Sequence, residues 1–170
     1  PPDASIMFIG EAPGYNENQQ GRPFVGPAGH FLDELLASIG LSRADVYIGN
    51  VIKCRPPNNR DPLPEEMRSC AKWLDRQLEI IQPKIVVTLG RYSMARFFPG
   101  ETIGKIHGTA RRKDGVTCFA MYHPAAALHQ QSLRKVIEED MKKLPKLLEQ
   151  AVDLKEAPKQ APQPKQLSMF

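Results

Sequence analysis

The sequence has 170 residues, of which 41% are hydrophobic, so one domain with a real hydrophobic core is expected and global disorder is excluded. Its 23 basic and 19 acidic residues give a net charge of +4, which is compatible with a nucleic-acid partner but also common among soluble proteins. The sequence contains no apolar run of about 18 residues and no secretory signal, so no membrane span is expected and a cytoplasmic location is favoured. Three cysteines in such a chain argue against a disulfide scaffold.

Short apolar runs alternate with stretches of helical periodicity along most of the chain. The expected elements, in chain order, are a strand at 5–9, a helix at 27–39 ended by Gly40, a strand at 46–52, a helix at 64–81, a strand at 85–89, a helix at 91–98, a strand at 116–121 and a helix at 132–152. Residues 111–115 are interpreted as a basic turn between two short strands. Ser132 is expected to cap the last helix, and Pro145 to kink it or end it early.

This order predicts a three-layer α/β/α fold around a central, mostly parallel, four-stranded sheet. In such sheets, binding sites gather beyond the carboxyl ends of the strands. The segment 10–14, Asn50, Gly90 and His123 all fall at the ends of predicted strands and are therefore expected at one edge. We assign residues 1–153 to this domain. Residues 154–170 form a tail rich in Pro, Lys and Gln without apolar periodicity, typical of a flexible linker.

Four motifs occur together in residues 5–150: Gly-Glu-Ala-Pro-Gly at 10–14, Gly-Arg-Pro-Phe-Val-Gly at 21–26, Asn-Val-Ile-Lys-Cys-Arg-Pro-Pro at 50–57, and His-Pro-Ala at 123–125. Each alone is weak evidence, because each has a purely structural interpretation. As an ordered set the four motifs resemble the family 4, iron–sulfur branch of the uracil-DNA glycosylases. The resemblance implies the fold of that superfamily and the removal of uracil from DNA.

The resemblance assigns the binding of the uracil base to Phe24 and Asn50. A flipped base needs an aromatic face for stacking, and Phe24 matches the stacking position of the family. The Asn50 amide offers a donor and an acceptor, which suits O4 and N3–H of uracil. A wrong base would leave buried polar groups unpaired, at a cost of about 1–3 kcal/mol.

The resemblance assigns catalysis to His123 and Glu11. Cleavage leaves negative charge on the departing uracil, chiefly at O2, and His123 matches the residue that donates to it. The backbone N–H groups after Gly10 are expected to assist. Ala12 takes the place of the aspartate that activates water in better-known relatives, so Glu11 is assigned to base or water positioning, with general-base action as the weaker alternative.

The cysteines suggest a cofactor. Cys54 and Cys70 match the last two ligands of the 4Fe–4S cluster of the family, which needs four thiolates. The family takes the other two from an N-terminal Cys-x-x-Cys, so we expect a truncated chain and a structural cluster in the intact protein. Two buried free thiols are the alternative.

Residues with weaker signals complete the expected site. Candidate DNA contacts are Arg55, Lys105 and Arg111, with solvated surface charge as the alternative for each. Leu128 is a candidate wedge for the gap left by the flipped base, unless it simply begins a helix. The terminal residues Gln166, Leu167, Met169 and Phe170 resemble the short peptide by which bacterial proteins bind the replication sliding clamp.

The expected protein is a cytoplasmic, nucleoid-associated monomer that removes uracil from single- and double-stranded DNA, leaves an abasic site and has no membrane partner. Two alternatives stay open because of Ala12. One is a glycosylase for other deaminated or oxidised bases. The other is a damage-binding or clamp-associated module with little catalysis.

Overall fold

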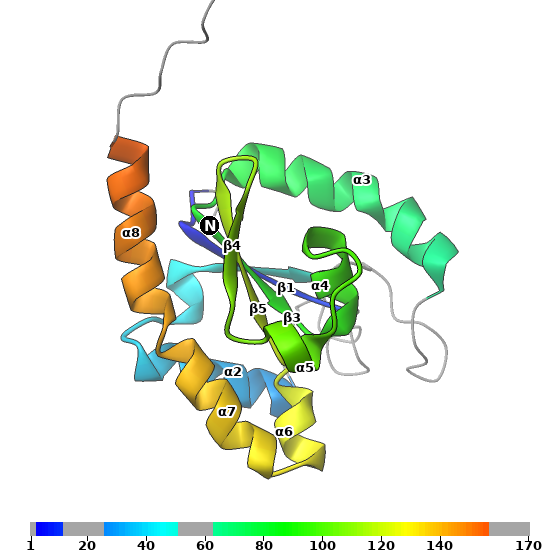
Figure 1. Ribbon diagram of the computed structural model, residues 1–170, viewed down its shortest axis with the longest axis vertical. Coiled ribbons are helices and arrows are strands. Elements are labelled where there is room, and N and C mark those ends of the chain that lie inside the picture. Colours follow the sequence, from blue (N-terminus) through cyan, green and yellow to red (C-terminus); the bar gives the residue numbers. More distant parts are fainter. Residues whose placement is uncertain (1–2, 12–25, 51–62, 157–170) are drawn as a thin grey trace, which may run out of the picture.

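A computed structural model describes residues 3–11, 26–50 and 63–156. They form helices on both sides of one five-stranded sheet, so the fold has three layers (Figure 1). The strands are β1 (Ile6–Gly10), β2 (Tyr47–Asn50), β3 (Ile85–Leu89), β4 (Ala110–Lys113) and β5 (Val116–Met121). The helices are α2 (Pro27–Ser38), η1 (Arg43–Asp45), α3 (Pro64–Ile81), α4 (Arg91–Phe97), α5 (Ile103–Ile106), α6 (Ala125–His129), α7 (Ser132–Met141) and α8 (Leu144–Glu156).

The sheet has the order β2-β1-β3-β5-β4, and all neighbouring pairs are parallel except β4 with β5. Its parallel part agrees with the predicted α/β/α fold. The carboxyl ends of β1, β2, β3 and β5 therefore meet at one edge. The register places Gly10 opposite Asn50, and Leu89 opposite Met121.

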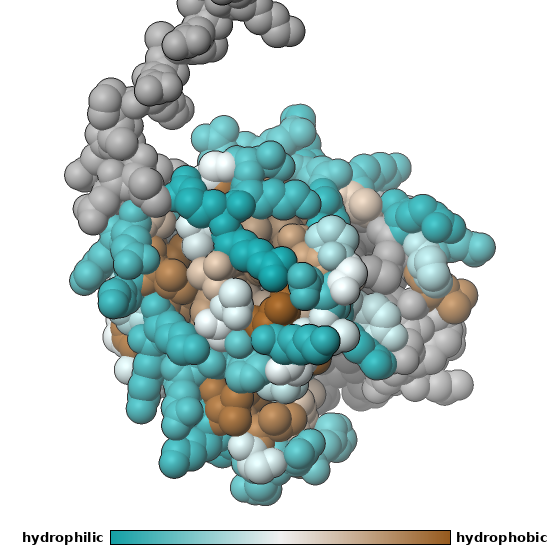
Figure 2. Space-filling model, viewed as in Figure 1, coloured by the Kyte–Doolittle hydropathy of each residue, from teal (hydrophilic) through white to brown (hydrophobic). Residues whose placement is uncertain are grey.

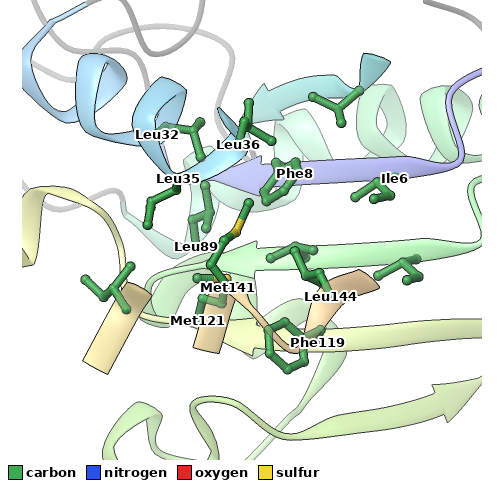
Figure 3. Close-up of a cluster of buried hydrophobic side chains, with 14 of the residues drawn as sticks. Ile6, Phe8, Leu32, Leu35, Leu36, Leu89, Phe119, Met121, Met141 and Leu144 are labelled. Atoms are coloured by element: carbon green, nitrogen blue, oxygen red, sulfur yellow. The ribbon is translucent and has the colours of Figure 1, made fainter. Parts of the chain in front are cut away.

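The two faces of the sheet hold separate apolar clusters because successive strand side chains point to opposite faces. Phe8, Leu89, Phe119 and Met121 belong to the larger cluster, which α2, α7 and α8 cover. Figure 3 shows Met141 and Leu144 reaching this cluster from the helical side, with Leu32, Leu35 and Leu36 of α2 beside them. On the other face, α3 covers Met7, Ile9 and Val86, while α4 and α5 cover Cys118 and Ala120.

Two predicted helix ends are confirmed. The Gly40 N–H donates to Ala37 O at 3.0 Å, and the Leu41 N–H donates to Leu36 O at 2.9 Å. These two bonds make a Schellman motif, and Gly40 supplies the positive φ of 78° that the motif requires. The long C-terminal helix divides into α7 and α8, with Pro145 in the first turn of α8, where its missing N–H costs no helical bond.

Three sequence-based expectations need correction. The sheet has five strands rather than four, because residues 111–113 of the expected basic turn belong to strand β4. The turn itself is Asp114-Gly115, with φ values of 52° and 81°, as a tight hairpin turn requires. β4 is an edge strand whose exposed charged residues show no apolar alternation. Ser132 is the first residue of α7, not its cap, which is Gln131.

Hydrophilic side chains cover most of the face shown in Figure 2, and apolar side chains appear there in separate small patches. Large apolar side chains that are exposed in the described ranges are Leu63, Trp73, Ile80 and Leu128. Within those ranges, no helix has both the length and the apolar character needed to cross a bilayer.

Candidate active site at the carboxyl edge of the sheet

The carboxyl edge brings together Gly10, Asn50 and His123. Asn50 ends β2 beside Gly10, and His123 follows β5 two residues after Met121. The intervening order is β2, β1, β3 and β5, and neighbouring strands lie about 4.8 Å apart. The row from Asn50 to β5 is therefore roughly 14 Å wide.

Asn50 is held with little freedom. Only 7% of the residue is exposed, and its strand is paired to β1 along its length. An amide in such a place discriminates strongly between partners, because a buried donor or acceptor without a bond costs about 1–3 kcal/mol. This burial suits the role in base recognition that the sequence suggests for Asn50.

The imidazole of His123 has a defined tautomer. Its Nδ1 lies 3.0 Å from the backbone N of Ala125, whose N–H can only donate. Nδ1 therefore accepts, and the proton of the neutral ring is on Nε2. Gly90 also lies close to this residue, since a Cβ added at Gly90 would lie 3.2 Å from the His123 Cβ. Gly90 has a φ of 92°, so a side chain there would be strained as well.

Glu11 follows Gly10 directly and is partly buried, which places a carboxylate at the same edge. Ala12 and Phe24 lie outside the described residues, so their predicted roles stay predictions.

A group that the sequence analysis missed lies next to this edge. Asp140 of α7 is 3% exposed, and its Oδ2 lies 2.7 Å from Nδ1 of His107. The His107 ring in turn stacks at a tilt against Tyr122, with 5.0 Å between the ring centroids. One sequence signal was available: Asp140 is an acidic residue on the apolar stripe of a helix, between Ile137 and Met141.

The candidate DNA contacts have different surroundings. Lys105 is exposed on α5, and Leu128 is 49% exposed on α6, one turn after His123. The short helix α6 is the structural alternative that the sequence left open for Leu128. Arg111 is engaged within the protein: both terminal nitrogens lie 3.2 Å from Oε1 of Glu101. Arg55 lies outside the described residues.

Among the three cysteines, the structure describes the side-chain surroundings of Cys118. Cys54 lies outside the described residues, and Cys70 belongs to α3. Cys118 is buried in β5, and desolvation raises the pKa of its thiol to about 11, with Asp114 adding to the rise and Lys113 opposing it. A thiol with this pKa is protonated at neutral pH and does not favour metal binding. In the part of the chain that the structure describes, no three His, Cys, Asp or Glu side chains form a metal-binding group.

A cavity of about 530 Å³ lies away from this edge, at the amino ends of β3 and β5. Its walls are mostly apolar, with Val86, Phe97 and Val116 among them, and Arg96 and Lys113 at the charged part of the lining. It contains none of the predicted site residues. The candidate active site is therefore the carboxyl edge, where the buried Asn50 amide and the His123 imidazole lie.

Comparison with known proteins identifies the family of the chain. Residues 1–150 match the model of the uracil DNA glycosylase superfamily. A type-4 uracil-DNA glycosylase of Sulfurisphaera tokodaii is 51% identical over 156 residues, covering 86% of this chain and 71% of the relative. The type-4 enzymes of Archaeoglobus fulgidus and Saccharolobus solfataricus are each 49% identical, over 85% of this chain and 77% and 72% of their own lengths. The chain therefore belongs to the uracil-DNA glycosylase superfamily, in its type-4 branch.

Proposed function

We propose that this protein hydrolyses the N-glycosidic bond of uracil in DNA, which leaves an abasic site and starts base-excision repair. Family membership and the residues at the carboxyl edge support this activity. The strand itself stays uncut, since the proposed reaction is a hydrolysis at the sugar–base bond only.

The observation that carries the proposal is the tautomer of His123. With Nδ1 accepting from the Ala125 N–H, the ring offers its Nε2–H as a donor. A neutral donor at this position stabilises the charge that develops on uracil O2 as the bond breaks. The backbone N–H groups after Gly10 are proposed as further donors.

The remaining roles follow the same logic. Asn50 pairs with O4 and N3–H of the base, Phe24 stacks on its face, and Ala12 contributes to the floor of the base pocket. Glu11 positions the base or the attacking water. Leu128, exposed beside His123, is proposed to fill the gap in the DNA stack, and Lys105 to contact a phosphate.

The direct test is an alkali-cleavage assay. The purified protein is incubated with an oligonucleotide that carries one uracil, and hot alkali then cuts the strand wherever an abasic site has formed. We expect cleavage of single- and double-stranded substrates only after alkali. No cleavage by the wild-type protein would contradict the proposal. A matched hypoxanthine substrate tests the second candidate, a preference for another deaminated base.

We also propose a structural 4Fe–4S cluster, with Cys54 and Cys70 as two of its four thiolate ligands. The two residues match the family positions, and the raised pKa of Cys118 makes it an unsuitable third ligand. Two thiolates from outside these 170 residues would have to complete the set. When bound, the cluster would supply structural cross-linking rather than electrons, because the hydrolysis transfers none. Iron and sulfide analysis of the protein tests this.

Two further proposals concern partners and location. Residues 166–170 are proposed to bind the replication sliding clamp, and the protein to act as a monomer on cytoplasmic, nucleoid-associated DNA. Deletion of residues 166–170 should abolish clamp binding and leave excision on short oligonucleotides unchanged. Clamp binding that survives the deletion would contradict the proposed role of residues 166–170.

A further inference from the structure

A buried carboxylate lies behind the catalytic edge. Asp140 is 3% exposed, and its helix α7 presents it to the domain interior beside the buried residues Ile137 and Met141. Its Oδ2 accepts from Nδ1 of His107 at 2.7 Å, and Oδ1 lies 3.4 Å from Nζ of Lys143. Burial of a carboxylate is unfavourable unless it is bonded in this way.

The Asp140 carboxylate also packs against the turn that precedes β4. Gly108 follows His107 with a φ of 72°, and a Cβ at Gly108 would overlap the carboxylate. The Gly108 N–H donates to Ala120 O at 2.7 Å, and the Ala120 N–H donates to Thr109 O at 3.2 Å. Asp140 is thus joined, through the turn at Gly108, to the last part of β5, directly before Tyr122.

The His107 side chain also contacts the segment that carries His123. The His107 ring packs on the Tyr122 ring, with centroids 5.0 Å apart and an angle of 33° between the planes. His123 comes next in the chain, and its Cβ lies against Gly90. The Ala125 N–H also donates a hydrogen bond to Nδ1 of His123. The backbone at Tyr122 and His123 is therefore fixed between a side-chain stack and a glycine.

We infer that Asp140 and His107 are positioning residues for His123. Asp140 orients the His107 ring, this ring holds Tyr122, and the held Tyr122 aims the Nε2–H of His123 at the departing base. The inference rests on the proposed function, because it takes His123 as the donor. If the Asp140–His107 hydrogen bond only linked α7 to the end of α5, its loss would lower stability and leave the chemical step unchanged. A positioning role would also affect the chemical step.

The test uses Asp140→Asn and His107→Gln, with Ile137→Val as the matched control. Ile137 is fully buried on the same helix, so its substitution weakens packing without touching the hydrogen bonds. We expect the single-turnover rate of uracil release to fall about 10- to 100-fold in the first two variants, as small misplacements of reacting groups do. KM should change by less than about twofold, and the control should keep the wild-type rate. The ring ¹⁵N signals of His123 should shift in the first two variants only.

Equal rates in all three variants, or a loss that lies wholly in KM, would overturn the inference. If Asp140→Asn does not fold, His107→Gln decides, since the His107 side chain is 29% exposed and tolerates replacement better. An inactive wild-type protein would contradict the proposed function instead. In that case the ring signals of His123 still report whether Asp140 and His107 position it.

Discussion

The two ends of the sheet differ in the space and the chemistry that they offer. The amino end has a cavity of about 530 Å³ with mostly apolar walls. The carboxyl end has a buried amide at Asn50 and an imidazole at His123 that accepts from the Ala125 N–H and lies against Gly90. Volume alone would select the amino end, whereas the predicted site residues lie at the carboxyl end. Catalysis depends on preorganised donors, and these gather where parallel strands end and their loops begin.

The largest effect should come from the donor at the carboxyl end. His123→Ala removes the Nε2–H from the developing charge, and loss of one such donor costs about 10²- to 10³-fold in rate. Single-turnover cleavage of a uracil oligonucleotide measures it. A rate within tenfold of wild type would assign the main stabilisation to another group.

Asn50→Ala should produce the next largest loss. Each hydrogen bond to the base that disappears is worth about 1–3 kcal/mol, so uracil excision should slow by up to about 100-fold. The same assay, run with uracil and hypoxanthine substrates in parallel, also shows whether selectivity falls with rate. Unchanged selectivity would mean that Asn50 does not read the base edge.

Cys118, which lines the amino-end cavity, should affect stability rather than activity. Its thiol has a pKa of about 11 in the folded protein against 9.0 without burial. The unfolded chain therefore loses the proton first, and the free energy of unfolding should fall as pH rises from about 9 to 11, by on the order of 2 kcal/mol. Urea titrations across this range measure the fall, and Cys118→Ala should remove it. A fall of equal size in that variant would place the titrating group elsewhere.

Removal of a charge beside the amino-end cavity should lower stability by less than the titration of Cys118 does. Arg96 pairs with Asp75 at the surface, and exposed ion pairs of this kind contribute about 0–1 kcal/mol. Arg96→Ala should lower the thermal unfolding midpoint slightly and leave uracil release unchanged. A tenfold loss of activity would break the contrast between the two ends, because it would give the cavity a part in the reaction.

The smallest effect is expected inside β3. Among the described residues, the Thr88 hydroxyl is the one buried side-chain polar atom without a hydrogen-bond partner. Thr88→Val removes this group and keeps the shape, so stability should stay the same or rise by about 1 kcal/mol. A clear loss in urea denaturation would indicate that the hydroxyl has a partner.

Much of the site could be predicted because it depends on local patterns. Apolar runs marked β1 and β3, and the alternation of strands with helices required parallel pairing. Asn50 and His123 each fall at the end of such a run, so their common edge was expected from topology alone. The carboxyl-edge location was therefore predicted before any contact was known.

Other features depend on contacts between distant parts of the chain, and only the tertiary structure decided them. Asp140 meets His107 across 33 residues, because α7 packs onto the sheet beside the end of α5. The tautomer of His123 follows from one backbone N–H, and Arg111 is engaged by Glu101. Sequence periodicity reports which face of an element is buried. It does not report which polar groups meet there, because that depends on the packing of one layer against the next.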